Sequence, residues 1–256
     1  MKHQLLTLFM DFNANKPSHI FAFLLLMISI LFIFILPIVT FIVFYDTDYL
    51  SGITIDEFSA IISQMIVIGV FIIVPFMWYL LVNRLKFKGI LPRIGLVSEN
   101  IDMAFLWGIL AAIAIFAIIF VIELGLIGLG HKPEDLSNIP NLQALFSPAV
   151  MFFLVAIQPI GEEIFFRGFL YEKIEKFSGP MLSIVITSIL FGVAHMSYAK
   201  WFPALMPILM GFVLGYIVYR TKNLYSAIIA HVAFNLTSLT LAYLGQELLK
   251  DMALIL

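Results

Sequence analysis

The sequence contains no cysteine and few charged residues, and each absence narrows what the protein can be. Without cysteine the chain has no disulfide, no thiolate metal ligand and no cysteine nucleophile. Charged residues make up only 12% of the 256 positions, about half the share that soluble domains carry. The net charge of −2 provides no basic surface for nucleic acid. We therefore expect neither a soluble domain nor a nucleic-acid-binding protein.

Apolar residues, in contrast, make up 62% of the chain. A transmembrane helix needs about 20 consecutive, mostly apolar residues, and seven segments of the sequence meet this requirement. They are residues 20–44, 60–82, 103–129, 147–167, 181–199, 203–219 and 224–245. The sequence thus predicts an all-α polytopic membrane protein of about seven transmembrane helices, with the lipid bilayer as its solvent.

The chain divides into four parts by composition. Residues 1–18 mix apolar and polar side chains, which is typical of an interfacial amphipathic helix. Residues 19–146 hold the first three predicted spans, 147–245 hold the last four, and 246–256 form a short tail. We expect the function to lie in 147–245, because the polar residues within spans concentrate there.

The distribution of positive charge predicts an orientation. If the N-terminus is cytoplasmic, eleven Lys and Arg residues face the cytoplasm and three face outward, as the positive-inside rule requires. The predicted topology is N-in and C-out, in a multi-pass protein of the cell membrane. Short loops and the lack of a eukaryotic targeting motif favour a bacterial plasma membrane.

Ionisable residues inside membrane spans cost roughly 2.5–3.5 kcal/mol each on insertion, so their presence suggests a function. Five such groups and one amide fall in three of the last four spans. They are Glu162, Glu163, Arg167, His195, His231 and Asn235. Each residue alone has an ordinary structural explanation, such as an ion pair or an interhelical hydrogen bond. The clustering of all six favours a functional site.

The spacing of the acidic residues indicates different roles for the two glutamates. Glu163 and Arg167 stand four residues apart, the separation of an ion pair on one helix face. Adjacent helical residues point about 100° apart, so Glu162 is free to act as a general base on water. His195 on the next span can share that water.

His231 and Asn235 are also four residues apart and present nitrogen donors to one place. Such donors stabilise the oxyanion that forms during acyl transfer. A base, a water-orienting histidine and an oxyanion site together indicate a hydrolase. Outside this set we assign no function to Glu123, and we interpret Gly211 and Gly215 as a helix-packing surface.

The same residues resemble the motifs of the CPBP family, the CAAX proteases and bacteriocin-processing enzymes, which includes the type II CAAX prenyl endopeptidases and the Abi proteins. The family pattern is E-E-x-x-x-R, F-x-x-x-H and H-x-x-x-N, each on its own span. The matching segments are Glu162-Glu163-Ile-Phe-Phe-Arg167, Phe191-Gly-Val-Ala-His195 and His231-Val-Ala-Phe-Asn235. No H-E-x-x-H, G-x-G-D or G-x-S-x-G motif of the other intramembrane proteases occurs.

The resemblance implies a conical core bundle and an intramembrane endopeptidase that cuts a peptide or membrane-associated protein. It implies that Glu162 activates water together with His195, and that Glu163 and Arg167 support them. His231 and Asn235 would stabilise the oxyanion. Because members are often labelled metalloproteases, and two His with one Glu can bind zinc, Glu162, His195 and His231 are also candidate zinc ligands.

Two other functions remain open from the sequence. A non-proteolytic immunity or partner-binding protein could retain the same fold, and a proton-coupled transporter could use the buried Glu and His as a relay. The depth of His195 also needs explanation, since it lies roughly 10 Å deeper than Glu162 if its helix starts at the membrane surface. We therefore expect the fifth helix to begin in the cytosol, covered by residues 168–178.

Overall fold

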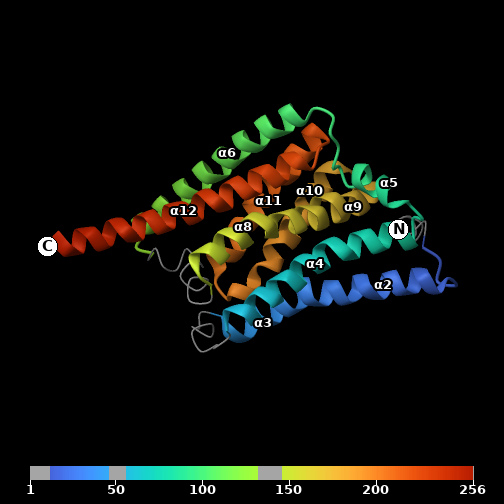
Figure 1. The fold of residues 1–256 in the computed structure, drawn as a ribbon, viewed down its shortest axis with the longest axis horizontal. Coiled ribbons are helices and arrows are strands. Elements are labelled where there is room, and N and C mark those ends of the chain that lie inside the picture. The colour runs from blue at the N-terminus through green and yellow to red at the C-terminus, as the bar shows by residue number, and fades with distance from the viewer. Residues whose placement is uncertain (1–11, 46–55, 132–145, 256) are drawn as a thin grey trace.

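The computed structural model of the protein describes residues 12–45, 56–131 and 146–255, and for 246–255 it describes the backbone alone. Every regular element in these parts of the chain is a helix (Figure 1). The elements are α2 (Pro17–Ile30), η1 (Leu31–Ile35), α3 (Leu36–Phe44), α4 (Glu57–Leu81), α5 (Phe87–Arg93), α6 (Ile101–Gly128), α8 (Pro148–Glu163), η4 (Ile164–Leu170), α9 (Tyr171–Ser178), α10 (Pro180–Ala194), η5 (Met196–Tyr198), α11 (Trp201–Thr221) and α12 (Tyr225–Ile255).

Seven helical stretches among the described residues are long and apolar enough to span a membrane, which confirms the predicted fold class. Six of them agree with the predicted spans to within three residues at each end. The fourth is longer than predicted, because α8, η4 and α9 form one stretch, Pro148–Ser178. The predicted tail 246–256 instead extends α12 to Ile255. Most of the predicted amphipathic segment 1–18 lies outside the described residues.

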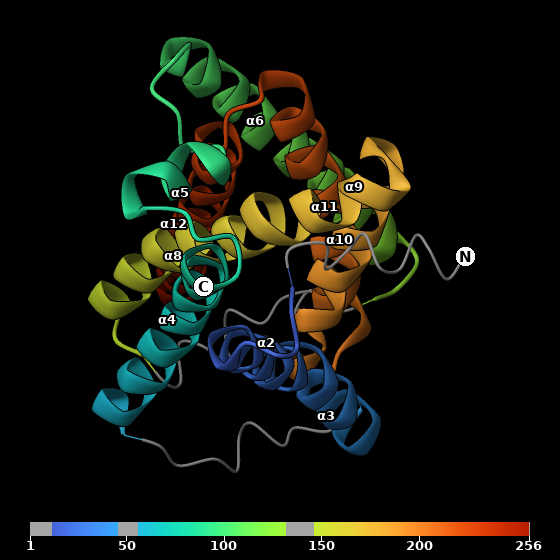
Figure 2. The same ribbon diagram turned by 90° about the vertical axis from the view of Figure 1, so that its right-hand side faces the viewer.

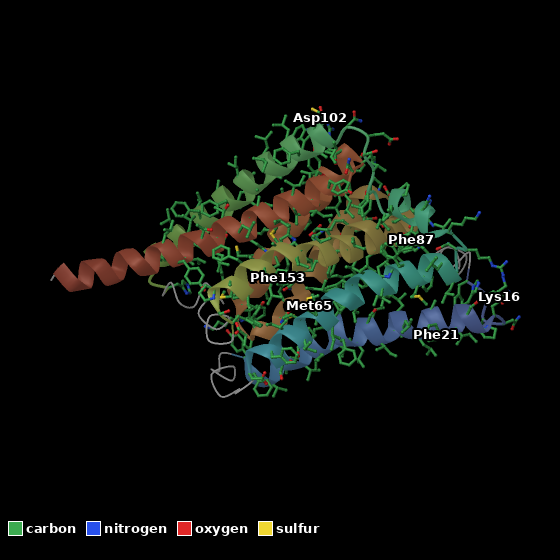
Figure 3. All side chains as sticks on the ribbon, in the orientation of Figure 1. Lys16, Phe21, Met65, Phe87, Asp102 and Phe153 are labelled. Carbon is green, nitrogen blue, oxygen red and sulfur yellow. The ribbon has the colours of Figure 1, made fainter. Side chains whose placement is uncertain are left out.

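The outer surface of the bundle is apolar. Phe21 on α2, Met65 on α4 and Phe153 on α8 all point away from the neighbouring helices (Figure 3) and are exposed. Soluble monomers rarely expose apolar patches of this kind over a large area. The exterior is therefore suited to lipid, as expected for a multi-pass membrane protein.

Residues at the helix starts explain several of these boundaries. Pro17, Pro148 and Pro180 occupy the first helical positions, where the missing amide hydrogen costs nothing. Asp56 caps α4, because its carboxylate accepts from the Ser59 amide at 3.0 Å. Hydrogen bonds from the side chain and backbone of Ser59 lower the pKa of Asp56 below its usual value.

Helix α8 lies inside the bundle, between the pair α2–α4 and the pair α6–α12 (Figure 2). It contacts α4 on one side and α12 on the other. The acidic end of α8 is consequently surrounded by protein on both sides, where a buried carboxylate can find hydrogen-bond partners.

A tight turn at Gly179 sets the relative depth of the two neighbouring helices. Gly179 has a φ of 77°, a conformation that favours glycine, and it joins α9 to α10, which pack together. Glu162 lies 17 residues before this turn and His195 lies 16 residues after it. The two side chains are therefore at nearly the same level. Residues 168–178 lie beside the start of α10 as predicted, and their location in the cytosol stays a prediction.

The predicted packing surface on α11 is confirmed. A Cβ atom at Gly211 would lie 2.9 Å from the Ser188 Cα, and one at Gly215 would lie 3.1 Å from the Ile184 Cγ2. Both neighbours belong to α10. These glycines let α10 and α11 approach closely, and this contact fixes the position of α10, the helix that carries His195.

A group of polar contacts holds α9 in place. The Glu172 carboxylate accepts from the Tyr79 hydroxyl on α4, from Arg93 Nη2 on α5 at 2.5 Å and from Lys176 Nζ at 2.9 Å. These contacts join three helices at the end of the bundle from which α10 starts. They thereby support the turn that aligns Glu162 with His195.

Candidate active site

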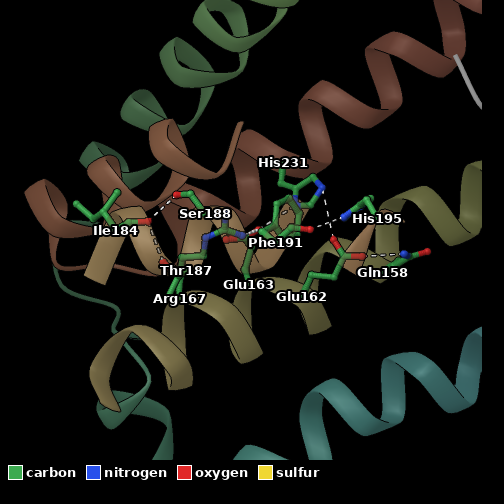
Figure 4. A network of polar contacts seen from close by, with 10 residues as sticks. All are labelled: Gln158, Glu162, Glu163, Arg167, Ile184, Thr187, Ser188, Phe191, His195 and His231. Carbon is green, nitrogen blue, oxygen red and sulfur yellow. Dashed lines mark hydrogen bonds and ion pairs between the residues drawn. The ribbon is translucent and has the colours of Figure 1, made fainter. Parts of the chain in front are cut away.

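The polar side chains of the site come from three segments that meet beside the end of α8. Glu162 and Glu163 are the last residues of α8, and Arg167 lies in the π-helical segment η4 that follows. His195 is the C-cap of α10, and His231 lies in the second turn of α12. Figure 4 shows these side chains gathered in one place. Wide π-helical turns are frequent at functional sites.

Glu163, Arg167 and His231 form a buried ionic group. Arg167 Nη1 donates to Glu163 Oε1 at 2.8 Å, and neither side chain is exposed, which confirms the predicted ion pair. The same oxygen accepts from His231 Nδ1, also at 2.8 Å. Because a carboxylate that is paired with Arg167 accepts, we assign the hydrogen of His231 to Nδ1, which leaves Nε2 to face the cavity. The sequence did not predict this contact.

Phe191 packs against three members of the site. The Arg167 guanidinium carbon lies 4.4 Å from the centroid of its ring, within the range of a cation–π interaction. The imidazoles of His195 and His231 make edge-to-face contacts with that ring at 4.7 and 5.7 Å. The Phe191 carbonyl also accepts from His195 Nδ1 at 2.8 Å. Phe191 therefore orients both histidines, a role that the motif alone did not reveal.

Glu162 shares His231 with Glu163 as a neighbour but has a hydrogen-bond partner of its own. Gln158 Nε2 donates to Glu162 Oε1 at 2.7 Å, while Glu162 Oε2 lies 3.8 Å from His231 Nε2 (Figure 4). The Glu162 side chain is buried within the protein, yet it borders an internal space. Sequence reasoning missed Gln158, although its position four residues before Glu162 is the spacing at which helical side chains interact.

Glu162 lies in the walls of two cavities. The first, of about 540 Å³, is lined from α6, α8, α11 and α12, and its walls include His195, His231 and Asn235. The second, of about the same volume, lies between α8 and the helices α2, α3 and α4. Glu162, His195 and Gln158 border both. A carboxylate and an imidazole thus line both cavities.

The structure brings the predicted catalytic residues to a common cavity and places the supporting pair behind them. Glu162, His195, His231 and Asn235 all line the first cavity, whereas Glu163 is fully buried and borders neither cavity. Their chemical roles stay predictions.

The side chains present do not form a ready metal site. No group of three His, Asp or Glu residues within the described parts of the chain is arranged to hold a metal ion. His195 Nδ1 and His231 Nδ1 are both engaged in hydrogen bonds, which leaves Nε2 of each ring free, as it is in histidines that bind a metal. The zinc hypothesis stays a prediction, and we assign no step to a metal.

Comparisons with known proteins agree with the motifs. Residues 144–237 match the family described as Type II CAAX prenyl endopeptidase Rce1-like. The resemblance to the CAAX protease family is confirmed. A protein of Bacillus subtilis (strain 168) with the name "Putative membrane peptidase YdiL" is 32% identical over 146 residues, which are 54% of this chain and 56% of that protein. The chain thus matches about half the length of this relative. No solved structure is significantly similar.

The segment that matches the family, residues 144–237, contains every predicted site residue. It begins just before α8 and ends in α12, so it includes the walls that α8, α10, α11 and α12 contribute. Helices α2, α3, α4 and α6 lie outside it. The family match therefore gives no information about the α6 wall of the first cavity. It also gives none about the walls that α2, α3 and α4 contribute to the second.

Proposed function

We propose that the protein is an intramembrane endopeptidase in which Glu162 and His195 activate a water molecule. One observation carries the proposal: a glutamate and a histidine from different spans border the same two cavities. The family resemblance supports peptide hydrolysis as the reaction. The substrate would be a peptide or membrane-associated protein that reaches the site from within the bilayer or its surface.

The hydrogen bonds of the site suggest how the water would be held. His195 Nδ1 donates to the Phe191 carbonyl, so in the neutral imidazole Nε2 has a lone pair and accepts a hydrogen bond. The Glu162 carboxylate also accepts. A water that donates one hydrogen to each keeps its own lone pair for the carbonyl carbon of the substrate. As the carbon–oxygen bond forms, Glu162 takes a proton.

The other side chains would act on the tetrahedral intermediate. Asn235 can donate from its amide to the developing oxyanion, and His231 can donate from Nε2 when the ring is protonated. Glu162 then delivers its proton to the leaving nitrogen as the carbon–nitrogen bond breaks. Arg167 and Glu163 would hold His231 in place and touch no substrate atom.

Purified protein in detergent, incubated with a library of apolar peptides, tests this proposal. We expect cleavage at internal bonds by the wild type and its loss in Glu162→Gln, which replaces the base with an amide of the same shape. Circular dichroism and thermal unfolding of the variant would show that the fold is kept. Unchanged cleavage by Glu162→Gln would refute the assigned base. If the full cellular phenotype survives in Glu162→Gln and His195→Ala, a partner-binding role replaces the enzymatic one.

A further inference from the structure

The first cavity extends well beyond the catalytic side chains, and a second carboxylate lies in its wall. Glu123, on α6, lines this cavity together with Phe116, Phe120 and Ile127 of the same helix. Its side chain is partly buried, and it makes no hydrogen bond or ion pair with any other described residue. A carboxylate in an apolar wall without a partner is costly. A cationic group of a bound ligand would offset that cost.

The distance from Glu123 to the site can be followed along the helices. The ring of Phe116 lies 6.5 Å from that of Phe234 on α12, beside His231 and Asn235. Glu123 is seven residues further along α6, which corresponds to about 10 Å. The wall that α12 contributes to the cavity runs from His231 to Ala242. These eleven residues correspond to about 16 Å along the helix axis. An extended peptide covers about 3.3 Å per residue. Roughly three to five substrate residues would therefore lie between a side chain at Glu123 and the bond at the catalytic residues.

The charge of the cavity indicates which side chain would fit there. Among the described residues that line it, Glu123 and Glu162 are the acidic ones, and none is Lys or Arg. A substrate carboxylate would be repelled by Glu123, whereas an ammonium or guanidinium would form a charge-assisted hydrogen bond with it. The aromatic rings of Phe116 and Phe120, stacked at 6.2 Å, would cover the apolar stem of such a side chain.

We propose that Glu123 forms a specificity subsite for a lysine or arginine of the substrate, about three to five residues from the bond that is cut. This inference rests on the proposed peptidase function and adds a substrate class to it: apolar segments with one basic residue on a fixed side of the cleavage site. Glu123 would act in binding and would take no part in proton transfer.

A peptide series tests the subsite. The probes are apolar peptides of one sequence in which a single Lys, Met or Glu is placed at successive positions, and mass spectrometry locates the cut. For the wild type we expect the cut to move with the Lys, at a constant spacing of about three to five residues. We expect kcat/KM for Lys peptides to exceed that for Met peptides by about tenfold.

Two variants and a control complete the test. Glu123→Gln should lose the preference for Lys over Met, and Glu123→Lys should transfer it to the Glu peptides. Asp102→Asn, which removes an exposed charge from the same helix, should leave the preference as it is in the wild type. A cut that does not follow the Lys, or a preference that survives in Glu123→Gln, overturns the subsite while peptide hydrolysis stands.

A binding measurement separates failure of the subsite from failure of the proposed function. In the Glu162→Gln background, fluorescence anisotropy with labelled Lys and Met peptides should show tighter binding of the Lys peptide. Adding Glu123→Gln should abolish the difference. If no peptide is cleaved by the wild type but this difference is found, the subsite is supported and the hydrolytic function fails. Equal binding of the two peptides overturns the subsite.

Discussion

Glu163 and His231 are 68 positions apart in sequence, yet a carboxylate oxygen of the first and Nδ1 of the second lie 2.8 Å apart in the core. The same oxygen also accepts from Arg167. The Glu163 carboxylate thus binds the Arg167 guanidinium and the His231 imidazole, which belong to different helices. The position of the His231 ring in the cavity therefore depends on a residue that does not itself line that cavity.

Removal of the Glu163 charge should destabilise the protein strongly. Glu163→Gln leaves the Arg167 guanidinium buried without its counter-ion, and breaking a buried pair in this way costs about 3–5 kcal/mol. Thermal unfolding in detergent measures the change, with Asp102→Asn as a surface control. In a double-mutant cycle with Arg167→Met, the combined loss should be smaller than the sum of the single losses. Additive losses would show that the two side chains do not act as a pair.

Gln158 should matter for turnover more than for stability. Gln158→Leu removes the hydrogen bond to Glu162 Oε1 and leaves the carboxylate free to rotate away from the water. We expect kcat to fall about tenfold, the effect of one lost hydrogen bond to a charged group, with little change in unfolding temperature. Thr240→Val, which removes an exposed hydroxyl from α12, serves as the control. Equal turnover in both variants would argue against a positioning role for Gln158.

His195 should be required for the chemical step. Because His195→Ala removes the proposed water-orienting group, we expect kcat to fall by roughly 10²–10⁴, the range for a lost acid–base partner. His131→Ala changes an exposed histidine at the end of α6 and should have no effect. Rates from single-turnover cleavage would distinguish a slower chemical step from slower product release. A fall in kcat below threefold would contradict the role.

The contact between α10 and α11 should be sensitive to added volume. Gly211→Ala places a Cβ 2.9 Å from the Ser188 Cα, and such overpacking costs about 1–3 kcal/mol. Gly125→Ala is the matched control, since a Cβ there meets nothing within 4 Å and alanine favours a helix. We expect a lower unfolding temperature for the first variant and an equal or higher one for the second. The opposite order would show that the helices separate easily.

Chelation of divalent metals should leave peptide cleavage unchanged. The described residues include no group of three His, Asp or Glu arranged to hold a metal ion, and the proposed activation of water needs only Glu162 and His195. Cleavage measured after dialysis against a strong zinc chelator, and again after zinc is restored, makes the comparison. Activity that is lost and then recovered with zinc would require a different arrangement of Glu162, His195 and His231.

The sequence by itself determined the spans and the Glu163–Arg167 pair. Length and composition decide whether a helix can cross a bilayer, and residues four apart share a helix face wherever that helix packs. The overlong fourth helix was missed because the polar run Glu172–Lys176 ends the apolar pattern, although α9 stays helical through its contacts with α4 and α5.

Only the tertiary structure decided which helix faces meet. The contact of Glu163 with His231, the placement of Phe191 among the site residues and the inclusion of Glu123 in the cavity depend on how each helix is rotated about its axis. That rotation is set by close packing between segments far apart in the chain, such as Gly211 against Ser188. No local spacing encodes it, so the residues of the site could be predicted while their partners on other helices could not.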